Sequence, residues 1–384
     1  MSRKAVIVTG ELSGEIHGTH LVKALKESSS LQFSGMGSRR LLEAGVDVVY
    51  DYRDISVTGV SEVFFKARHL WRAYDTLKRH LLRASPDLLI LVDFPGFNLM
   101  IARTAKRLGI PTVYFIPPQV WAWRKGRMER IKALVDLVLC ILPFEEALYR
   151  DRGIPVKYTG HPFTETVKPL YTKEAFFSLL AIEGDAPVIT MMPGSRLNEV
   201  EKHLPVLTRV VVHLQKHLGR FTVLLPVADT LDEGLFASFV GQAEGIIPVK
   251  GLPYDSLAHS DAAVIASGSA ALEAAILGVP SLVLYKVSRL SFLIARMVVK
   301  VKHISLPNII AGHEIFPEFV QSLDPERIAK TVVSMLNSDK SALQRELELV
   351  RKKLATSDRG PYRTASEHIL QFLEQRYGPL PETA

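Results

Sequence analysis

Residues 262–274 read Ala-Ala-Val-Ile-Ala-Ser-Gly-Ser-Ala-Ala-Leu-Glu-Ala: an apolar run, a turn of small residues and an alanine-rich segment. The pattern predicts a buried parallel strand, a tight turn at Ser267, Gly268 and Ser269, and a helix after it. Free N–H groups and the positive end of the helix dipole meet at such a turn, which suits a phosphate group. Glu273 lies about one helical turn later, where its carboxylate could accept hydrogen bonds from ribose hydroxyls. A strand–helix turn with nothing bound is the alternative interpretation.

A second turn of this kind follows the apolar residues 188–192. Its sequence is Pro193-Gly194-Ser195-Arg196, and a segment with helical spacing comes after it. Arg196 can hold a phosphate in a bidentate way while the turn amides share the charge. Two such turns, one with a cation, favour a phosphate-bearing ligand over two empty turns.

The N-terminal part of the chain also alternates strands with helices. Residues 5–9 read as a buried strand, and the turn after them contains Gly10, Glu11, Ser13, Gly14 and Glu15. The glycines do not spell GxGxxG, and the two carboxylates would repel a pyrophosphate, so a dinucleotide site is not expected here. Glu11 and Glu15 are better suited to sugar hydroxyls or to helix capping.

Asp93 follows the fully apolar residues 88–92 in a turn rich in proline and glycine. Ligands of open α/β sheets bind outside the carboxyl ends of the strands. Asp93 is therefore a candidate general base, although an N-cap for the following helix fits its position equally well.

Composition limits the kind of protein and its partners. The 384 residues are 47% hydrophobic and 23% charged, which predicts a folded protein with room for two domains of ordinary size. The series of apolar, strand-like runs stops over residues 163–185, and we interpret this segment as the region between the domains. The single Cys140 excludes an intrachain disulfide and is expected in the core, and metal-binding Cys/His spacings are absent. A net charge of +7 suits an anionic partner.

Two segments combine aromatic and basic residues. Residues 61–83 form an amphipathic pattern that includes Phe64, Phe65, Trp71 and Arg72. The pattern predicts a helix packed on the sheet, and it also fits a face that contacts an anionic lipid surface. RNA would need a nucleic-acid module, and none is recognisable. A second segment, the loop at 117–127, carries Trp121, Trp123 and Arg124, a set that can bind sugar faces, acyl chains or phosphate.

With these motifs in place, the sequence resembles the bacterial lipid-A-disaccharide synthases, glycosyltransferases with two Rossmann-like domains. Eight pieces carry the resemblance in chain order: GELSGE at 10–15, VDFPGFN at 92–98, VWAWR at 120–124, LPFE at 142–145, GHP at 160–162, PGSR at 193–196, ASGSAALE at 266–273 and SLPNIIAG at 305–312. The resemblance implies two doubly wound parallel-sheet domains that face a cleft, the GT-B arrangement. Their expected bounds are 1–165 and 166–354, with the helices of 355–384 packing back on the N-terminal domain.

The family reaction transfers 2,3-diacylglucosamine from UDP to the 6-hydroxyl of 2,3-diacylglucosamine 1-phosphate (lipid X), with inversion. By this resemblance the donor nucleotide sits mainly on the C-terminal domain, and we expect Asp93 to be the base. The expected donor-binding set is Arg196, Ser195, Ser267, Gly268, Ser269, Glu273, Asn308 and Gln321. The expected cleft contacts are Glu11, Ser13, Gly14, Glu15, Trp121, Trp123, Arg124 and His161, although a structural role is the commoner one for a histidine.

The resemblance also sets expectations about partners. The substrates imply a cytoplasmic, peripheral protein on the inner membrane, in contact with anionic lipids and with no nucleic acid. No DxD motif accompanies the eight pieces, so we expect no metal and no other cofactor. The oligomeric state stays open, a homodimer included.

Two positions depart from the family pattern. Glu15 stands where the family often has aspartate, and it keeps the charge on a longer side chain. Gly96 stands where the family often has a second carboxylate, which leaves Asp93 as the one that matters. The competing interpretations are a UDP-sugar 2-epimerase, a transferase for a water-soluble acceptor, and a non-catalytic binding protein for nucleic acid or anionic lipid.

Overall fold

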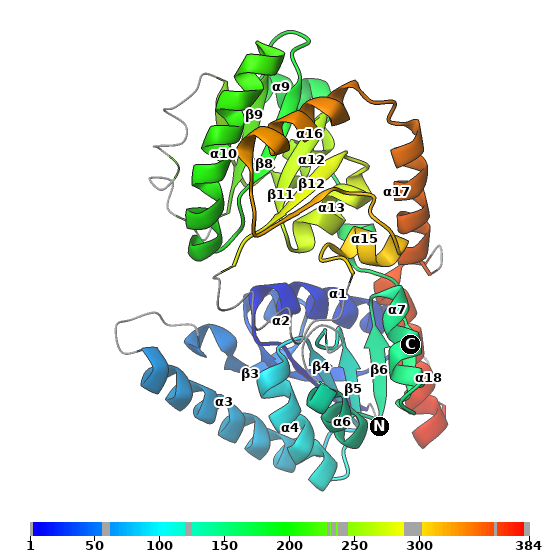
Figure 1. Cartoon of the computed structure of the whole chain (residues 1–384). Helices are drawn as coiled ribbons and strands as arrows, with labels where there is room; N and C mark the ends of the chain where they lie inside the picture. The colour runs from blue at the N-terminus through cyan, green and yellow to red at the C-terminus, as the bar shows by residue number, and fades with distance from the viewer. Residues whose placement is uncertain are drawn as a thin grey trace. The chain divides into compact units, whose positions relative to one another are not determined.

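The computed structural model describes residues 3–55, 62–119, 125–228, 231, 236, 245–287, 302–356 and 359–379, with the side chains of 55, 62–66 and 125 excepted. The chain divides into two compact units (Figure 1). Unit 1 comprises Met1–Pro162 and Leu354–Ala384, and unit 2 comprises Phe163–Lys353. The boundaries expected from the sequence are 165/166 and 354/355.

Unit 1 contains a seven-stranded sheet in the order β3-β2-β1-β4-β5-β6-β7, with every pair parallel. The strands are β1 Lys4–Val8, β2 Gln32–Gly37, β3 Asp47–Asp51, β4 Leu88–Val92, β5 Thr112–Phe115, β6 Leu137–Cys140 and β7 Val156–Tyr158. All residues of β4, β5 and β6 are buried, as apolar runs covered on both faces should be. The expected core position of Cys140, in β6, is confirmed.

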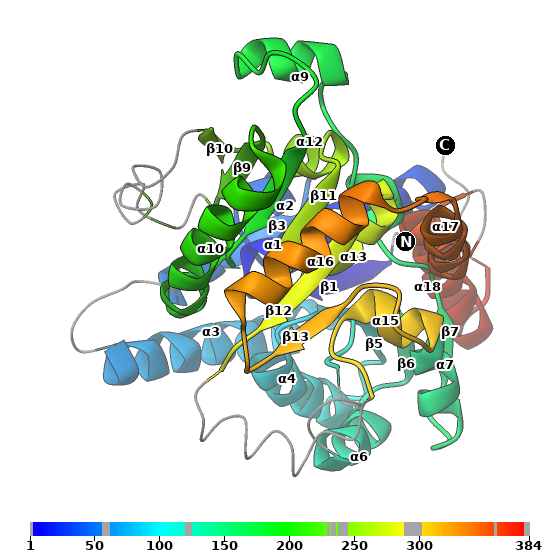
Figure 2. The ribbon, with the colours of Figure 1, turned by 45° about the horizontal axis from the view of Figure 1, so that its top comes forward.

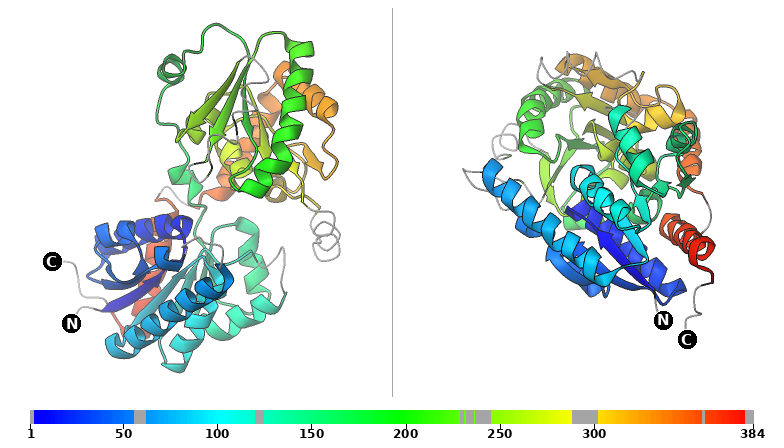
Figure 3. Two further views of the ribbon diagram at one scale, coloured as in Figure 1. Left: turned by 90° about the vertical axis from the view of Figure 1, so that its left-hand side faces the viewer. Right: turned by 90° about the horizontal axis from the view of Figure 1, so that it is seen from below.

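Helices cover both faces of this sheet (Figures 1 and 3). They are α1 Leu12–Ser28, α2 Arg39–Glu43, α3 Glu62–Ala84, α4 Pro95–Arg107, α6 Lys125–Leu134, α7 Pro143–Arg150 and α18 Pro361–Tyr377, with a 3₁₀ helix at Tyr52–Ile55. One apolar cluster joins the sheet to α3, α4, α6 and α7, and another joins it to α1 and α18. The end of the chain therefore packs back on the N-terminal unit, which confirms that part of the expected fold.

Unit 2 contains a six-stranded parallel sheet in the order β10-β9-β8-β11-β12-β13. Its strands are β8 Val188–Met192, β9 Thr222–Val227, β10 Ile246–Lys250, β11 Ala262–Ala266, β12 Ser281–Tyr285 and β13 Glu318–Val320. Its helices are α8 Phe163–Thr166, α9 Lys173–Leu179, α10 Leu197–Leu218, α12 Pro253–Ala258, α13 Ser269–Leu277, α15 Leu306–Ala311, α16 Pro325–Asn337 and α17 Ser341–Leu354, whose last residue belongs to unit 1. Helices α10 and α16 lie side by side over one face (Figure 2). Residues 262–274 form the expected strand, turn and helix.

Each sheet has one place where the strand order reverses. In unit 1 it lies between the neighbours β1 and β4, and in unit 2 between β8 and β11. The chain leaves the carboxyl ends of neighbouring strands in opposite directions there, which opens a crevice for ligands. The turns that follow these four strands carry Glu11, Asp93, Arg196 and Ser267, so the sequence motifs lie where the topology places ligands.

In the part of the chain that the structure describes, no helix is both long and apolar enough to cross a membrane.

Candidate active site

A pocket of about 300 Å³ opens at the strand-order reversal of unit 2. Five of the residues expected to bind the donor line it: Ser195, Ser267, Gly268, Ser269 and Glu273. They come from the turn after β8, the turn after β11 and the first helical turns of α13. The parallel sheet therefore brings together two motifs that are far apart in the sequence.

The turn between β11 and α13 leaves the start of the helix open. Ser267 N–H donates to the Leu284 carbonyl on β12 at 2.7 Å, which anchors the turn to the sheet. Gly268 is the N-cap, and no side chain caps the helix. A Cβ added to Gly268 would meet nothing within 4 Å. The first N–H groups of α13 thus border open space, the arrangement that binds phosphate.

Glu273 lies one turn into α13. Burial raises the pKa of its carboxyl to about 7, while a hydrogen bond from the Ser269 hydroxyl opposes the shift. Tyr254, at the start of α12, also lines the pocket. Burial and the neighbouring Glu273 charge raise the pKa of this phenol to about 12. Sequence reasoning missed Tyr254 because its short segment carries no motif.

Arg196 lies beside the pocket and does not line it. It is the N-cap residue of α10, and its side chain is 78% exposed. Its Nη1 donates to Glu199 Oε1 at 3.1 Å, and Ser195 N–H donates to Glu199 Oε2 at 3.3 Å. The carboxylate of Glu199 thus takes the donors that the sequence assigns to a phosphate. Its spacing of three residues from Arg196 at a helix start was the available signal for this pairing.

The remaining two donor-site candidates hold backbone instead of lining the pocket. Asn308 is fully buried, and its Nδ2 donates to the Phe316 carbonyl and to Glu318 Oε1, both at 2.8 Å. Its Oδ1 accepts two backbone N–H groups at 2.9 Å, so its hydrogen-bonding capacity is used within the fold. Gln321 makes two hydrogen bonds to the backbone of Val287. We therefore assign both side chains to loop support in unit 2.

Asp93 follows β4 in a strained turn. Its φ is +47° and that of Phe94 is +43°, a region that residues other than glycine rarely occupy. The Asp93 carbonyl accepts hydrogen bonds from Asn98 Nδ2 and from the Tyr114 hydroxyl, both at 2.7 Å. The N-cap of α4 is Phe94, with no side-chain cap. The N-cap interpretation of Asp93 is therefore wrong, because the turn places this residue one position before the cap.

The carboxyl group of Asp93 is perturbed by its surroundings. Burial, the Glu11 charge and a hydrogen bond with Glu11 raise its pKa to about 6. The turn that carries Glu11 lies close against Asp93. A Cβ added to Gly10 would fall about 2 Å from the Phe94 ring, and one added to Gly14 would lie 3.8 Å from Asp93 Cβ. Ser13 Oγ lies 3.4 Å from Glu11 Oε1, a long contact at the surface.

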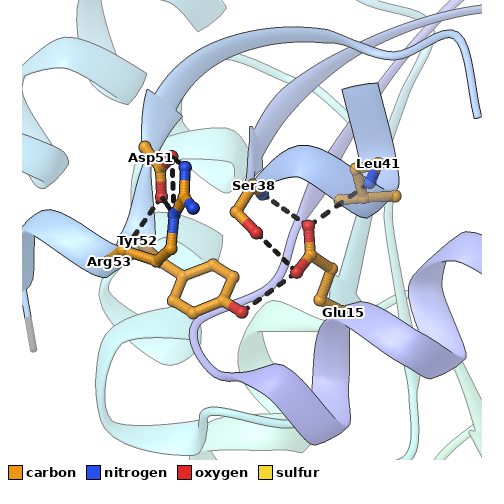
Figure 4. Close-up of polar contacts among 6 residues, drawn as sticks. All are labelled: Glu15, Ser38, Leu41, Asp51, Tyr52 and Arg53. Carbon is orange, nitrogen blue, oxygen red and sulfur yellow. Dashed lines mark hydrogen bonds and ion pairs between the residues drawn. The ribbon is translucent and has the colours of Figure 1, made fainter. Parts of the chain in front are cut away.

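Glu15 was expected among the cleft contacts, and the structure instead places its side chain inside unit 1. It is 1% exposed, and its carboxylate accepts hydrogen bonds from Ser38 N and Oγ at 2.6 and 2.7 Å (Figure 4). The Leu41 amide and the Tyr52 hydroxyl complete the set at 3.3 and 3.0 Å. Buried carboxylates need such partners. Glu15 thus joins α1 to α2 and to the 3₁₀ helix inside unit 1.

The other expected contacts divide into buried, undescribed and exposed residues. His161 is buried after β7, and burial together with His17 lowers its pKa to about 3, so it is neutral. Trp121, Trp123 and Arg124 lie outside the described residues, as do the side chains of Phe64 and Phe65. Trp71 is 65% exposed and Arg72 is exposed on α3. Among the described residues, no group of three or more His, Cys, Asp or Glu side chains could hold a metal ion.

Comparison with known proteins supplies the family. The profile of the lipid-A-disaccharide synthetase family matches residues 5–371. A lipid-A-disaccharide synthase of Syntrophus aciditrophicus (strain SB) is 42% identical over 359 residues, which cover 92% of this chain and 94% of that protein.

Solved structures agree on the fold. The S. aureus MnaA–UDP co-structure superposes with a TM-score of 0.69 at 14% identity, over 100% of this chain and 99% of that one. CalG4, the calicheamicin glycosyltransferase, gives a TM-score of 0.64 at 17% identity, over 98% and 100%. Identities this low show the fold alone, which is the expected GT-B arrangement of two parallel-sheet domains. Since the family profile spans nearly the whole sequence, the chain belongs to the lipid-A-disaccharide synthetase family of glycosyltransferases.

Proposed function

We propose that this protein transfers 2,3-diacylglucosamine from UDP to the 6-hydroxyl of lipid X, in one inverting displacement that Asp93 assists as general base. The family, whose reaction is this condensation, supplies the substrates. The observation that carries the residue assignment is that each unit has one candidate site at the reversal of its strand order. Unit 2 offers an anion-binding pocket, and unit 1 offers a carboxyl group with a raised pKa.

The donor pocket matches the parts of UDP. The open start of α13 suits the diphosphate, and negative charge that develops on this leaving group is stabilised by the same amides. Pro226, Val227 and Tyr254 supply an apolar wall for the uracil ring of UDP. Glu273 binds the ribose hydroxyls in its ionised form, as a hydrogen-bond acceptor.

The diphosphate also competes with Glu199. Because the Glu199 carboxylate accepts from Ser195 N–H and Arg196, a bound diphosphate replaces it on these donors. Arg196 is therefore proposed to bind the diphosphate, although its side chain lies beside the pocket. The Arg196–Glu199 pair is exposed, so its separation costs little.

Asp93 acts on the acceptor. Its carboxylate removes the proton from the 6-hydroxyl as this oxygen bonds to the anomeric carbon and the bond to UDP breaks. The proton ends on Asp93, and the electron pair of the broken bond leaves with UDP. A base with a pKa near 6 is ionised at neutral pH and is still basic enough to accept the proton.

The wider setting follows from the substrates. We propose that the protein works at the cytoplasmic face of the inner membrane, with Trp71 and Arg72 of α3 in contact with anionic lipids. We expect the reaction to need no metal ion, because the amides and Arg196 supply the charge stabilisation.

A product assay tests the proposal. The full chain is incubated with UDP-2,3-diacylglucosamine and lipid X, and mass spectrometry follows UDP and the tetraacyl disaccharide 1-phosphate. We expect equal amounts of both products, and only when lipid X is present. Consumption of the UDP-sugar without lipid X, with a 2-epimer formed, would support the epimerase interpretation and contradict the proposal.

A further inference from the structure

Besides the pocket of unit 2, the structure has a hollow in unit 1, and the residues that line it differ in chemistry from the site at Asp93. It measures about 580 Å³ and lies between α4 and α6. Three arginines line it: Arg103 of α4, and Arg127 and Arg130 of α6. None of the described residues that line it is acidic. We call this hollow the arginine groove.

Within the described part of the chain, the three arginines have no counter-ion. In the described ranges of the chain, no ion pair or side-chain hydrogen bond involves any of them. Some other exposed arginines of unit 1 do have an acidic partner, for example Arg79 with Asp75 and Arg150 with Glu146. Like charges gathered without a partner are unfavourable unless an anion neutralises them, and guanidinium groups suit a phosphate in particular.

The floor and the rim of the groove add two further properties. Leu99 and Met100 provide apolar surface, and Met100 is 45% exposed. Gly96 and Gly126 line the groove as well, and a Cβ added to either would meet nothing within 4 Å. The groove is therefore open and partly apolar beside its charges, which fits a phosphate carried by a larger amphiphile better than a free inorganic ion.

The groove is also close to the proposed base. Its lining begins at Pro95, two residues after Asp93. Burial and the Asp93 charge raise the pKa of Tyr114, and Arg127 acts in the opposite direction, so Arg127 lies within electrostatic reach of this phenol. The Tyr114 hydroxyl in turn donates to the Asp93 carbonyl at 2.7 Å.

We propose that the arginine groove binds the phosphate of the acceptor glycolipid, with Leu99 and Met100 against its adjoining acyl chain, and so holds the acceptor hydroxyl at Asp93. The inference rests on the proposed function, which supplies an acceptor whose phosphate and reacting hydroxyl belong to one sugar ring. The groove runs along α4 from Pro95 to Arg103, so a phosphate bound by its arginines leaves the sugar ring on the side of the groove that begins two residues after Asp93.

The test compares a charge-neutralising pair of substitutions in the groove with a matched pair outside it. The groove variant is Arg103→Gln with Arg130→Gln. The control is Arg107→Gln with Lys132→Gln, which removes one charge each from α4 and α6 at exposed positions that do not line the groove. Circular dichroism and thermal melting check that both variants are folded.

The kinetic readout uses lipid X and the same acylated sugar without its phosphate. For the groove variant, kcat/KM for lipid X should fall by about tenfold or more, because charge-assisted hydrogen bonds are lost. Its kcat/KM for the dephosphorylated acceptor and its KM for the UDP-sugar should stay within about twofold of wild type, because neither value depends on hydrogen bonds between these arginines and the acceptor phosphate. An equal loss with both acceptors would overturn the inference.

A binding readout separates this inference from the proposed function. Broadening of the ³¹P resonance of lipid X in detergent micelles, without any UDP-sugar, reports binding alone. Wild type and control should broaden the signal and the groove variant should not. If wild type makes no disaccharide, the proposed function fails, while a phosphate-dependent loss of broadening would still support the groove.

The phosphate in the groove could also come from the headgroup of a bulk membrane lipid, and sedimentation with phosphatidylglycerol vesicles tests this alternative. We expect equal sedimentation of wild type, control and groove variant. A groove variant that no longer sediments, yet keeps its preference for phosphorylated acceptor, would assign the groove to bulk membrane lipid and overturn the inference.

Discussion

Glu11 and Asp93 follow neighbouring strands of unit 1 and share a hydrogen bond between their side chains. The sequence indicated each of them as a polar residue after a strand. It did not indicate that they act on each other, because β1 and β4 are neighbours only in the folded sheet. Burial, and after it this tertiary contact, raise the pKa of Asp93.

The pH dependence of the reaction tests this pair. Asp93 must be ionised to accept a proton, so kcat/KM for the acceptor should fall as the pH drops through about 6. Glu11→Gln removes the neighbouring negative charge, lowers the pKa of Asp93 and should move this acidic limb to lower pH. Wild type and variant profiles are measured with saturating UDP-sugar. Superimposable acidic limbs would show that Glu11 does not act on the base.

Glu273 carries the second prediction at this scale. Burial raises its pKa to about 7, so the ionised form that accepts hydrogen bonds from ribose is lost as the pH falls through this value. The Kd of UDP should therefore rise from pH 8 to pH 6. Glu273→Gln should weaken UDP binding about tenfold, the cost of a hydrogen bond to a charged group, and reduce this pH dependence to the part that comes from the terminal phosphate of UDP itself.

Calorimetric titration with UDP measures both effects. Glu201→Gln, at an exposed position of α10 outside the pocket, is the matched control and should bind UDP as wild type does. A pH dependence as large in Glu273→Gln as in wild type would assign the titration to another group.

The turn between β4 and α4 is the element that presents the base. Asn98 Nδ2 binds the carbonyls of Val92 and Asp93, at 3.1 and 2.7 Å, and the Tyr114 hydroxyl binds the latter. These contacts hold two consecutive residues in the left-handed region, a conformation that costs of the order of 1 kcal/mol or more each. Aspartate is one of the few residues other than glycine that enter this region, but phenylalanine is not, so the sequence pattern did not reveal two consecutive residues in it.

Tyr114→Phe tests whether this support matters for the reaction. The variant removes one of two hydrogen bonds to the Asp93 carbonyl and should lower the free energy of unfolding by only about 1 kcal/mol. We expect a larger effect on kcat, a decrease of about tenfold, because misplacement of a catalytic group is costly. The KM of each substrate should not change. An unchanged kcat would show that Asn98 alone positions the turn.

Helix α3 is the element proposed to contact the membrane. Ala73, Leu77 and Leu81 bury one face in the core, which confirms the expected packing on the sheet, and Trp71 remains exposed on the helix. Trp71→Glu replaces an interfacial aromatic with a charge that anionic lipids repel. Binding to phosphatidylglycerol vesicles should weaken about fivefold or more, since each charge near such a surface is worth about 1 kcal/mol.

Leu42→Glu, which introduces the same charge at an exposed leucine of α2, is the control for this experiment. Its vesicle binding should equal that of wild type. Equal binding by the Trp71→Glu variant as well would leave α3 as a helix that only packs on the sheet.

At the scale of the whole molecule, the architecture was predictable because buried parallel strands and glycine-containing turns leave strong local patterns. The strand and helix at 262–274 are an example, whereas the return of α18 to unit 1 was expected from the family resemblance alone. The individual contacts were less predictable. Glu15, Asn308 and Gln321 have the residue types of ligand-binding groups, but their partners are backbone and side-chain groups that the fold brings close. The arginine groove has no sequence motif, because its arginines come from two helices that are separate in the sequence and meet only in the folded protein.

The family and the fold answer different questions about the whole chain. Epimerases and glycosyltransferases share this architecture, so the structural neighbours do not choose between them. The 42% identity over most of the chain does, in favour of the glycosyltransferase family. The assignment of the base to Asp93 is the part of the account that rests on chemistry.

The most direct measurement is therefore the single-turnover rate of disaccharide formation by Asp93→Asn, with saturating UDP-2,3-diacylglucosamine and lipid X. The Asp93 carbonyl keeps its hydrogen bonds in this variant and a buried negative charge is removed, so its melting temperature should be no lower than that of wild type and its Kd for UDP should match wild type. The account predicts a rate lower by about 10²- to 10⁴-fold, the usual contribution of a general base. A rate close to that of wild type would contradict it.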